Sequence, residues 1–411
     1  LMAFDFIKDA LAARRKDNLF RQVTTLDSAV GELIEVGGQY YLNFSSNDYL
    51  GMRQSTAVMQ GWVDGIGQFG GGSGASPLVT GHTQAHQALQ DYLAGVLGRD
   101  AVLLFNSGFA ANQALCQALF QLPVSQKSAS ERYIVADKLM HASLLEGAMG
   151  SDATLRRFAH NDCAHLQKQL DKIHAGAKST AQDILLVTEG VYSMDGDEAP
   201  LSELAIISEQ HKSWLMVDDA HGFGVLGKTG MGAVEKHGLN QEQVPVLMAT
   251  FGKAIGTAGA FVSGSQDLID YLTNFAKHYI YSTAMPPAQA VATLASLHTI
   301  EQSEQRALLH DNIAYFRQLA TAAGIALTPS MTAIQPIIIG SPELAIAISQ
   351  RLRNMGLWVS AIRTPTVPKG TDRLRITLSA SHHKKDIQAL VDGLILVMER
   401  ANEAEFIGEK R

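Results

Sequence analysis

The sequence predicts an α/β protein with a mostly parallel sheet, followed by a smaller α+β domain. From about residue 84 to residue 264, short runs rich in valine, leucine and isoleucine alternate with stretches of helical periodicity, a pattern typical of βαβ units. After about residue 295, two helical stretches precede short strands and a last helix, which is typical of an α+β unit. Helices cover both faces of such a parallel sheet, so we expect functional side chains at the carboxyl ends of its strands.

The individual elements follow from local patterns. An amphipathic helix is expected over about 5–21, a hairpin around Gly37-Gly38 within 31–44, and a long glycine-rich loop over 65–81. The strands expected in the large domain are 101–105, 133–136, 184–187, 214–217, 244–248 and 259–263, with helices over 85–97 and 110–119. The small domain is expected to hold helices 288–303, 307–323 and 385–402 and strands 335–339, 358–362 and 374–378. We therefore predict an N-terminal segment (1–50), a large domain (51–295) and a small domain (296–411).

Composition excludes several classes of function. The 411 residues suffice for two domains, and the net charge of −7 argues against a nucleic-acid partner. No apolar run approaches the roughly 20 residues of a membrane span, and the charged N-terminal helix differs from a signal peptide, so we expect a cytoplasmic protein without a membrane partner. The two cysteines, Cys116 and Cys163, lack metal-binding spacing, and no metal site is expected.

Two charged residues stand at the ends of expected strands. Lys253 follows the run 244–248, and Asp218 ends the run 214–217. A lysine can form a Schiff base with an aldehyde and a carboxylate can hold a pyridinium nitrogen, which are the two things that pyridoxal 5'-phosphate (PLP) requires of a protein. Burial would lower the pKa of the lysine, as a proton-transferring base needs. The alternatives are a solvated surface lysine and an aspartate that caps a helix.

Other polar side chains follow the same strands, each with a structural alternative. His221 could tune the charge of the cofactor's phenolic oxygen, and Ser193 could donate a hydrogen bond to that oxygen. His141 could stack on the pyridine ring, although a core histidine is the plainer interpretation. The tripeptide 107–109 opens a helix directly after a strand, where free N–H groups form an anion site, but an ordinary strand–helix turn has the same pattern.

Arginines near the small domain are candidates for binding a carboxylate. Arg373 and Arg375 alternate along one expected strand and therefore share a face. One of them could clamp a substrate carboxylate through paired hydrogen bonds, or either could pair with a surface acid. Arg21 and Arg363 leave the same two interpretations open.

Several motifs along nearly the whole chain occur together. They are LNFSSNDYLG (42–51), SGFAAN (107–112), HASLLE (141–146), RRFAHN (156–161), TEGVYSMDG (188–196), MVDDAHG (216–222), TFGK (250–253) and IYSTAMPPAQ (280–289). With these motifs the chain resembles the α-oxoamine synthases, PLP-dependent transferases of fold type I. The resemblance implies a seven-stranded large domain and a homodimer.

The resemblance also implies roles for the matching positions. Lys253 would bind the PLP aldehyde, Asp218 the pyridinium nitrogen, and His141 would stack on the ring and contact the substrate. The further cofactor contacts would be Gly108, Phe109, Ser193, His221 and Thr250, with Ser282 or Thr283 approaching the phosphate from a second subunit. The substrate contacts would be Arg21, Asn47, Thr366 and Arg375, of which Arg375 would hold the amino-acid carboxylate.

The segment AIRTPTVP (361–368) points to one branch of that family. This branch condenses L-alanine with a pimeloyl thioester of coenzyme A or acyl carrier protein, giving 8-amino-7-oxononanoate, CO2 and free thiol in biotin synthesis. The alternatives are a related synthase, of the 2-amino-3-ketobutyrate CoA ligase or 5-aminolevulinate synthase type, and a PLP aminotransferase.

Overall fold

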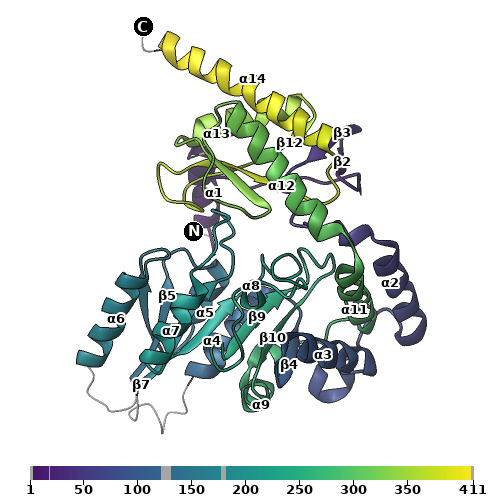
Figure 1. The fold of residues 1–411 in the computed structure, drawn as a ribbon, viewed down its shortest axis with the longest axis vertical. Coiled ribbons are helices and arrows are strands. Elements are labelled where there is room, and N and C mark those ends of the chain that lie inside the picture. Colours follow the sequence, from purple (N-terminus) through teal and green to yellow (C-terminus); the bar gives the residue numbers. More distant parts are fainter. Residues whose placement is uncertain (1–2, 18, 122–130, 177–181, 409–411) are drawn as a thin grey trace.

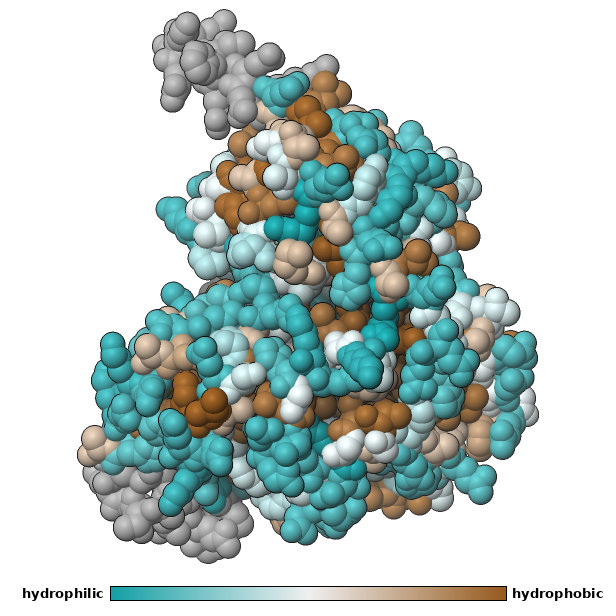
Figure 2. All heavy atoms as spheres, in the orientation of Figure 1, coloured by the Kyte–Doolittle hydropathy of each residue, from teal (hydrophilic) through white to brown (hydrophobic). Residues whose placement is uncertain are grey.

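Figure 1 shows the computed structural model, which describes residues 3–17, 19–121, 131–176 and 182–408. A larger α/β part lies below a smaller part, from which the helix α14 (Lys384–Gly408) extends upward. None of the helices in these ranges combines the length and the apolar character that crossing a bilayer requires. Figure 2 shows that hydrophilic residues cover most of this face, with apolar residues in separate patches.

The larger part is built on a seven-stranded sheet in the order β4-β10-β9-β8-β7-β5-β6. Only β10 runs antiparallel to its neighbours, and the remaining pairs are parallel, which confirms the mostly parallel sheet. The strands are β4 (Ala101–Phe105), β5 (Glu131–Asp137), β6 (Thr154–Phe158), β7 (Gln182–Glu189), β8 (Trp214–Asp218), β9 (Val246–Thr250) and β10 (Ala260–Gly264).

The apolar runs of these strands are continuous because both faces of the sheet are covered. Leu186 of β7 packs into one hydrophobic cluster, while its neighbours Leu185 and Val187 pack into the cluster on the opposite face. The helices of this part are α2 (Thr56–Phe69), α3 (Gln84–Leu97), α4 (Gly108–Phe120), α5 (Ala142–Met149), α6 (Cys163–Gly176), α7 (Leu201–Gln210), α8 (Ala233–Lys236), α9 (Gln266–Phe275), α10 (Lys277–Ile280) and α11 (Pro287–Gln302).

The smaller part combines the C-terminal elements with the N-terminal hairpin. Its elements are α12 (Gln305–Ala322), β11 (Ile334–Ile338), α13 (Pro342–Asn354), β12 (Leu357–Trp358), β13 (Ser360–Ile362), β14 (Arg373–Thr377) and α14. Strands β11, β14 and β13 form an antiparallel sheet, while β1 (Ser28–Val30), β2 (Leu33–Val36), β3 (Gln39–Asn43) and β12 form another. The N-terminal hairpin thus pairs with the C-terminal domain through β3 and β12, and the division at residues 50 and 295 stays a prediction.

Two local expectations were wrong. Helix α1 (Phe6–Lys16) ends before residue 21, and it has no buried residue whose packing would extend it. Within the expected loop 65–81, α2 continues to Phe69. Gly65 serves helix packing, because a Cβ there would lie 2.5 Å from the Cα of Ala288 in α11. Figure 1 shows α2 and α11 side by side.

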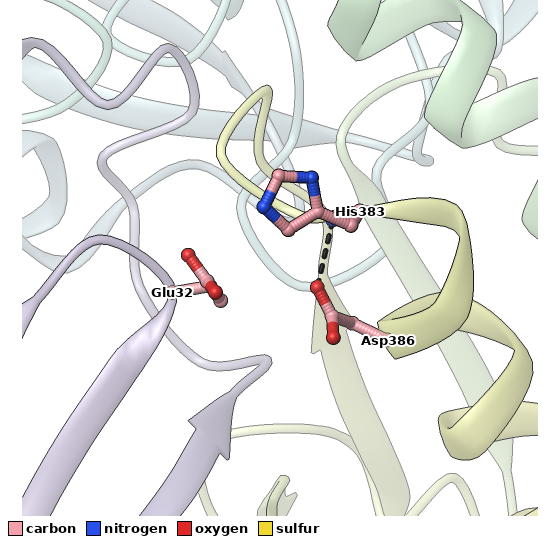
Figure 3. Close-up of side chains that lie close together, drawn as sticks. All are labelled: Glu32, His383 and Asp386. Carbon is pink, nitrogen blue, oxygen red and sulfur yellow. Dashed lines mark hydrogen bonds between the residues drawn. The ribbon is translucent and has the colours of Figure 1, made fainter.

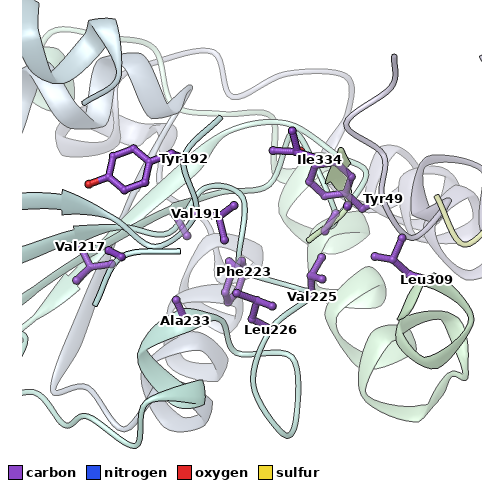
Figure 4. Packing of buried hydrophobic residues seen from close by; sticks show 14 of the residues in the cluster. Tyr49, Val191, Tyr192, Val217, Phe223, Val225, Leu226, Ala233, Leu309 and Ile334 are labelled. Atoms are coloured by element: carbon purple, nitrogen blue, oxygen red, sulfur yellow. The ribbon is translucent and has the colours of Figure 1, made fainter. Parts of the chain in front are cut away.

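One hydrophobic cluster joins the two parts. Figure 4 shows Tyr49 beside Ile334 of β11, close to Leu309 of α12, while Phe223 and Val225 continue the cluster below them. All five side chains are buried. The segment that carries Tyr49 is thereby fixed between the sheet and the small domain.

Candidate active site

The carboxyl ends of β5, β7, β8 and β9 and the start of α4 surround a cavity of about 230 Å³. Eight residues expected from the sequence line it, namely Asn47, Gly108, Phe109, His141, Asp218, His221, Thr250 and Lys253. Six further lining residues were not expected, namely Asn112, Ser143, Glu189, Ala220, Met248 and Gly252. Residues more than 200 positions apart in the chain thus face one space, as the parallel sheet requires.

Lys253 lies three residues beyond β9 and lines the same cavity as Asp218. Burial lowers the pKa of Lys253, and the charges of Asp218 and Glu189 oppose that shift only in part. Asp218 is 4% exposed and accepts hydrogen bonds from the Ala220 N–H (3.1 Å) and from Nδ2 of Asn112 (2.8 Å). A basic amine with a depressed pKa therefore shares the cavity with a buried, oriented carboxylate.

His221 follows Asp218 on the same loop and is also buried. Its Nδ1 lies 2.7 Å from the hydroxyl of Tyr49, so that one ring nitrogen is occupied by the protein. Burial, reinforced by the charge of Lys253, lowers the pKa of His221 well below its ordinary value. The imidazole is therefore neutral, with its other nitrogen available to the cavity.

The neighbouring Asp219 has a structural role. Its carboxylate accepts a hydrogen bond from the Ala233 N–H at 2.7 Å, and its side chain is fully buried. A Cβ at Gly232, where φ is +97°, would come within 1.9 Å of the Asp219 carboxylate, so glycine is required there. Asp218 lines the cavity, whereas Asp219 does not.

The start of α4 forms one wall of the cavity. Ser107 caps this helix by accepting a hydrogen bond from the Ala110 N–H at 3.1 Å. A Cβ at Gly108 would lie 3.7 Å from the Cβ of Thr250, so the glycine leaves the space between them open. The Thr250 hydroxyl donates to the Gly259 carbonyl at 2.8 Å. Free N–H groups in the first turn of a helix suit an anion such as a phosphate.

Comparison with known proteins identifies the family. Residues 40–394 match the family model of class I and II aminotransferases. The 8-amino-7-oxononanoate synthase of Aeromonas salmonicida (strain A449) is 47% identical over 94% of this chain and 93% of its own length. That of Alcanivorax borkumensis (strain ATCC 700651 / DSM 11573 / NCIMB 13689 / SK2) is 49% identical over 96% and 98% of the two chains. The chain belongs to the 8-amino-7-oxononanoate synthase family.

Solved structures agree with this fold. Serine palmitoyltransferase from Sphingomonas wittichii superposes with a TM-score of 0.89, at 28% identity, over 97% of this chain and 99% of that one. An 8-amino-7-oxononanoate synthase from Francisella tularensis superposes with a TM-score of 0.72, at 31% identity, over 89% and 99% of the two chains. The fold is therefore that of the fold type I PLP transferases.

In this member of the synthase family, a second cavity of about 580 Å³ adjoins the first, and His141 lines both. Besides His141, three expected residues line the second cavity, namely Arg21, Ser193 and Thr366. It also holds two cations that the sequence did not single out, Lys138 and Arg157. Ser193 therefore lines the second cavity and not the first.

The two arginines of β14 share a face, as their alternation predicted, but they have different partners. Nη1 of Arg373 forms an ion pair with Asp195 at 2.6 Å. Arg375 instead donates through Nε to the Ser193 carbonyl (2.7 Å) and through Nη2 to Oδ1 of Asn47 (3.2 Å). In the described part of the chain no carboxylate pairs with Arg375, which is 7% exposed. A buried guanidinium beside Asn47 therefore keeps its charge available for a carboxylate.

Ser282 and Thr283 lie apart from these two cavities. They line a third cavity with Asn106, whose Nδ2 donates to the Thr283 carbonyl at 2.7 Å. Within a single chain they do not face Lys253. Their expected approach from a second subunit stays a prediction.

Glu189 is a feature of the first cavity that the sequence did not single out. It lines the first cavity at the end of β7, is 3% exposed, and its Oε1 has no hydrogen-bond partner among the described residues. Burial, reinforced by the charge of Asp218, raises its pKa well above the ordinary value. The Glu189 carboxyl in the cavity wall therefore holds its proton more readily than an ordinary carboxyl does.

One cluster outside the cavities brings potential metal ligands together. Figure 3 shows Glu32 of the N-terminal hairpin beside His383 and Asp386 at the start of α14. The His383 N–H donates to Oδ2 of Asp386 at 2.8 Å, a contact that orders the first turn of the helix. This capping contact explains the position of Asp386 without an ion.

Proposed function

We propose that this protein condenses L-alanine with a pimeloyl thioester to give 8-amino-7-oxononanoate, CO2 and free thiol in biotin synthesis, with PLP as its cofactor. The observation that carries the proposal is the pair formed by Lys253 and Asp218, which line one cavity. This pair occurs in a chain 47% identical to a curated synthase of that name over almost its full length. Such an enzyme is an acyltransferase.

The residues of the cavity fit PLP. Lys253 would hold the aldehyde, Asp218 the pyridinium nitrogen, and His221 and Ser193 the phenolic oxygen. The N–H groups at the start of α4 would hold the phosphate, with Gly108, Phe109 and Thr250 as further contacts. His141 would lie on the outer face of the ring. When bound, PLP supplies an aldehyde that reacts with amines and a cationic ring that accepts electrons from the α-carbon.

Lys253 also acts as the base in this proposal. Because burial lowers the pKa of its ammonium group, a larger fraction of the side chain is a free amine at neutral pH. That amine removes the proton from Cα of alanine and later returns a proton to the product. Arg375 and Asn47 hold the alanine carboxylate, which sets the Cα–H bond toward Lys253.

The adjoining cavity of about 580 Å³ would take the acyl chain. Arg21 and Thr366 in its wall are the proposed acyl contacts, and His141, which lines both cavities, would donate a hydrogen bond to the thioester oxygen. The carrier is coenzyme A or acyl carrier protein. A homodimer in the cytoplasm, in which Ser282 and Thr283 of one subunit approach the phosphate bound by the other, completes the proposal.

The test is thiol release from pimeloyl-CoA by the purified protein loaded with PLP. L-Alanine should support release together with formation of 8-amino-7-oxononanoate, and glycine should support much less. Preference for glycine would overturn the assignment in favour of a related synthase. Transfer of the amino group to 2-oxoglutarate without thiol release would instead indicate an aminotransferase.

A further inference from the structure

His141 begins helix α5, and its ring serves as the cap of that helix. Nδ1 accepts a hydrogen bond from the Ser143 N–H at 3.2 Å and lies 2.7 Å from the Ser143 hydroxyl. No described residue makes a hydrogen bond with Nε2 of His141. A backbone N–H can only donate, so this bond already favours an unprotonated Nδ1, and the direction of the Nδ1–hydroxyl bond is the second determinant of where the ring proton lies.

The side chain of Asn112 decides the direction of that bond. Its Nδ2 lies 2.8 Å from Oδ2 of Asp218 and 2.9 Å from Oγ of Ser143. A carboxylate only accepts hydrogen bonds, so the amide must turn its NH2 group toward Asp218. The two hydrogens of that NH2 group then go to Asp218 and to Ser143. The Ser143 hydroxyl is thus already an acceptor.

A serine hydroxyl has one hydrogen to donate. Because Ser143 accepts from Asn112, that hydrogen is free for Nδ1 of His141, which then receives two donors and carries no proton. The start of α5 also disfavours a cation, since the N-terminus of a helix has a positive dipole end. Partial burial lowers the pKa of His141 as well, with Lys253 reinforcing and Asp218 opposing that shift.

We propose that Asn112 and Ser143 are positioning residues that fix His141 as the neutral tautomer with its proton on Nε2. The chain Asp218–Asn112–Ser143–His141 joins the end of β8, helix α4 and the start of α5, so the ring's orientation is tied to the carboxylate of Asp218. Nε2–H then offers one donor to a carbonyl or carboxylate oxygen in the cavities that His141 lines. The use of this donor on a thioester oxygen rests on the proposed function, whereas the tautomer itself does not.

The tautomer can be measured by NMR, without an activity assay. The protein is labelled with 15N-histidine, freed of cofactor, and studied by long-range 1H–15N correlation, and the His141 signals are those lost in His141→Asn. In the wild type we expect a protonated Nε2 and an unprotonated Nδ1 across neutral pH. In Ser143→Ala, the share of His141 with a proton on Nδ1, as the other tautomer or as the cation, should rise about fivefold or more. A wild-type ring protonated on Nδ1, or no change in Ser143→Ala, would overturn the proposal.

Two further variants separate the hydroxyl from packing. Ser143→Thr and Ser143→Val have the same shape, and only the threonine keeps a hydroxyl, so the wild-type tautomer should return with threonine alone. Ser151→Ala removes a serine hydroxyl from the other end of the same helix, where it donates to the Ala148 carbonyl at 2.7 Å, and should leave the His141 signals unchanged. Identical spectra for the threonine and valine variants would refute the role of the hydroxyl. Failure of thiol release with an intact tautomer would count against the proposed function only.

Discussion

The hydroxyl of Tyr49 lies 2.7 Å from Nδ1 of His221, and both side chains are buried. The same hydroxyl lies 3.2 Å from Oδ1 of Asn47, which also accepts from Nη2 of Arg375. Tyr49 therefore links the proposed carboxylate site to the histidine proposed to face the cofactor. It brings together residues 47, 221 and 375, which come from the N-terminal segment, the large domain and the small domain.

Replacing Tyr49 by Phe should destabilise the protein by about 1–3 kcal/mol, because Nδ1 of His221 would be left buried without a partner. The measurement is urea unfolding of the two proteins at neutral pH. Tyr41→Phe is the control, since its hydroxyl bonds Gln39 at the surface and its loss should cost less than about 0.5 kcal/mol. Equal stability of the two variants would show that the buried hydrogen bond contributes nothing.

Replacing Lys253 by Ala should lower thiol release by at least about 10³-fold, because both the cofactor attachment and the base are lost. Lys236→Ala is the matched control. That lysine pairs with Glu198 at 2.7 Å on the surface, and its loss should leave the rate within about twofold. A Lys253→Ala enzyme that kept a tenth of the activity would contradict the assignment.

The two arginines of β14 should respond differently to replacement by Lys. Arg375→Lys removes the planar fork that would hold the alanine carboxylate, so the KM for L-alanine should rise about 10- to 100-fold. Arg373→Lys weakens the pair with Asp195, and the KM should change by less than about threefold. Steady-state kinetics at saturating pimeloyl-CoA give both values. A larger rise in the KM for L-alanine in Arg373→Lys than in Arg375→Lys would show that Arg373, and not Arg375, holds the alanine carboxylate.

The sequence predicted the sheet and the pair at its centre for a simple physical reason. Strands buried on both faces appear as continuous apolar runs, and the polar residue that ends such a run must lie at the carboxyl edge of the sheet. Lys253 and Asp218 both follow this rule. Strand β6 was missed because it is an edge strand, and its sequence, Thr-Leu-Arg-Arg-Phe, lacks an apolar run.

The residues that orient the site could not be predicted in the same way. Tyr49, Asn112 and Ser143 act through contacts with partners up to 172 residues away, and no spacing in the chain encodes those contacts. Their motifs were recognised as shared with a family, but the hydrogen-bond directions require coordinates. Glu189 was not singled out, because its burial depends on the packing of the whole sheet edge.

His160, at the end of β6, joins two loops of the site through two carboxylates. Nδ1 lies 3.0 Å from Asp137, which is fully buried, and Nε2 lies 2.7 Å from Asp197. Both ring nitrogens therefore face acceptors, as in a cationic imidazolium. Burial disfavours that charge, but the hydrogen bonds to Asp137 and Asp197 outweigh burial and raise the pKa of His160 to about 10.

This shift predicts how stability depends on pH. Because the folded-state pKa lies above the ordinary value of 6.5, the stabilisation by His160 is complete below about pH 6.5 and is lost as the pH rises through about 10. The unfolding free energy of the wild type should therefore exceed that of His160→Gln by an amount that shrinks over this range. Urea unfolding at several pH values measures the difference. His165→Gln is the control, because the ring nitrogens of His165 contact the Ala159 N–H and the Gln169 side chain at 2.9 Å and not two carboxylates. A constant difference for His160→Gln would mean that the ring is neutral when the protein is folded.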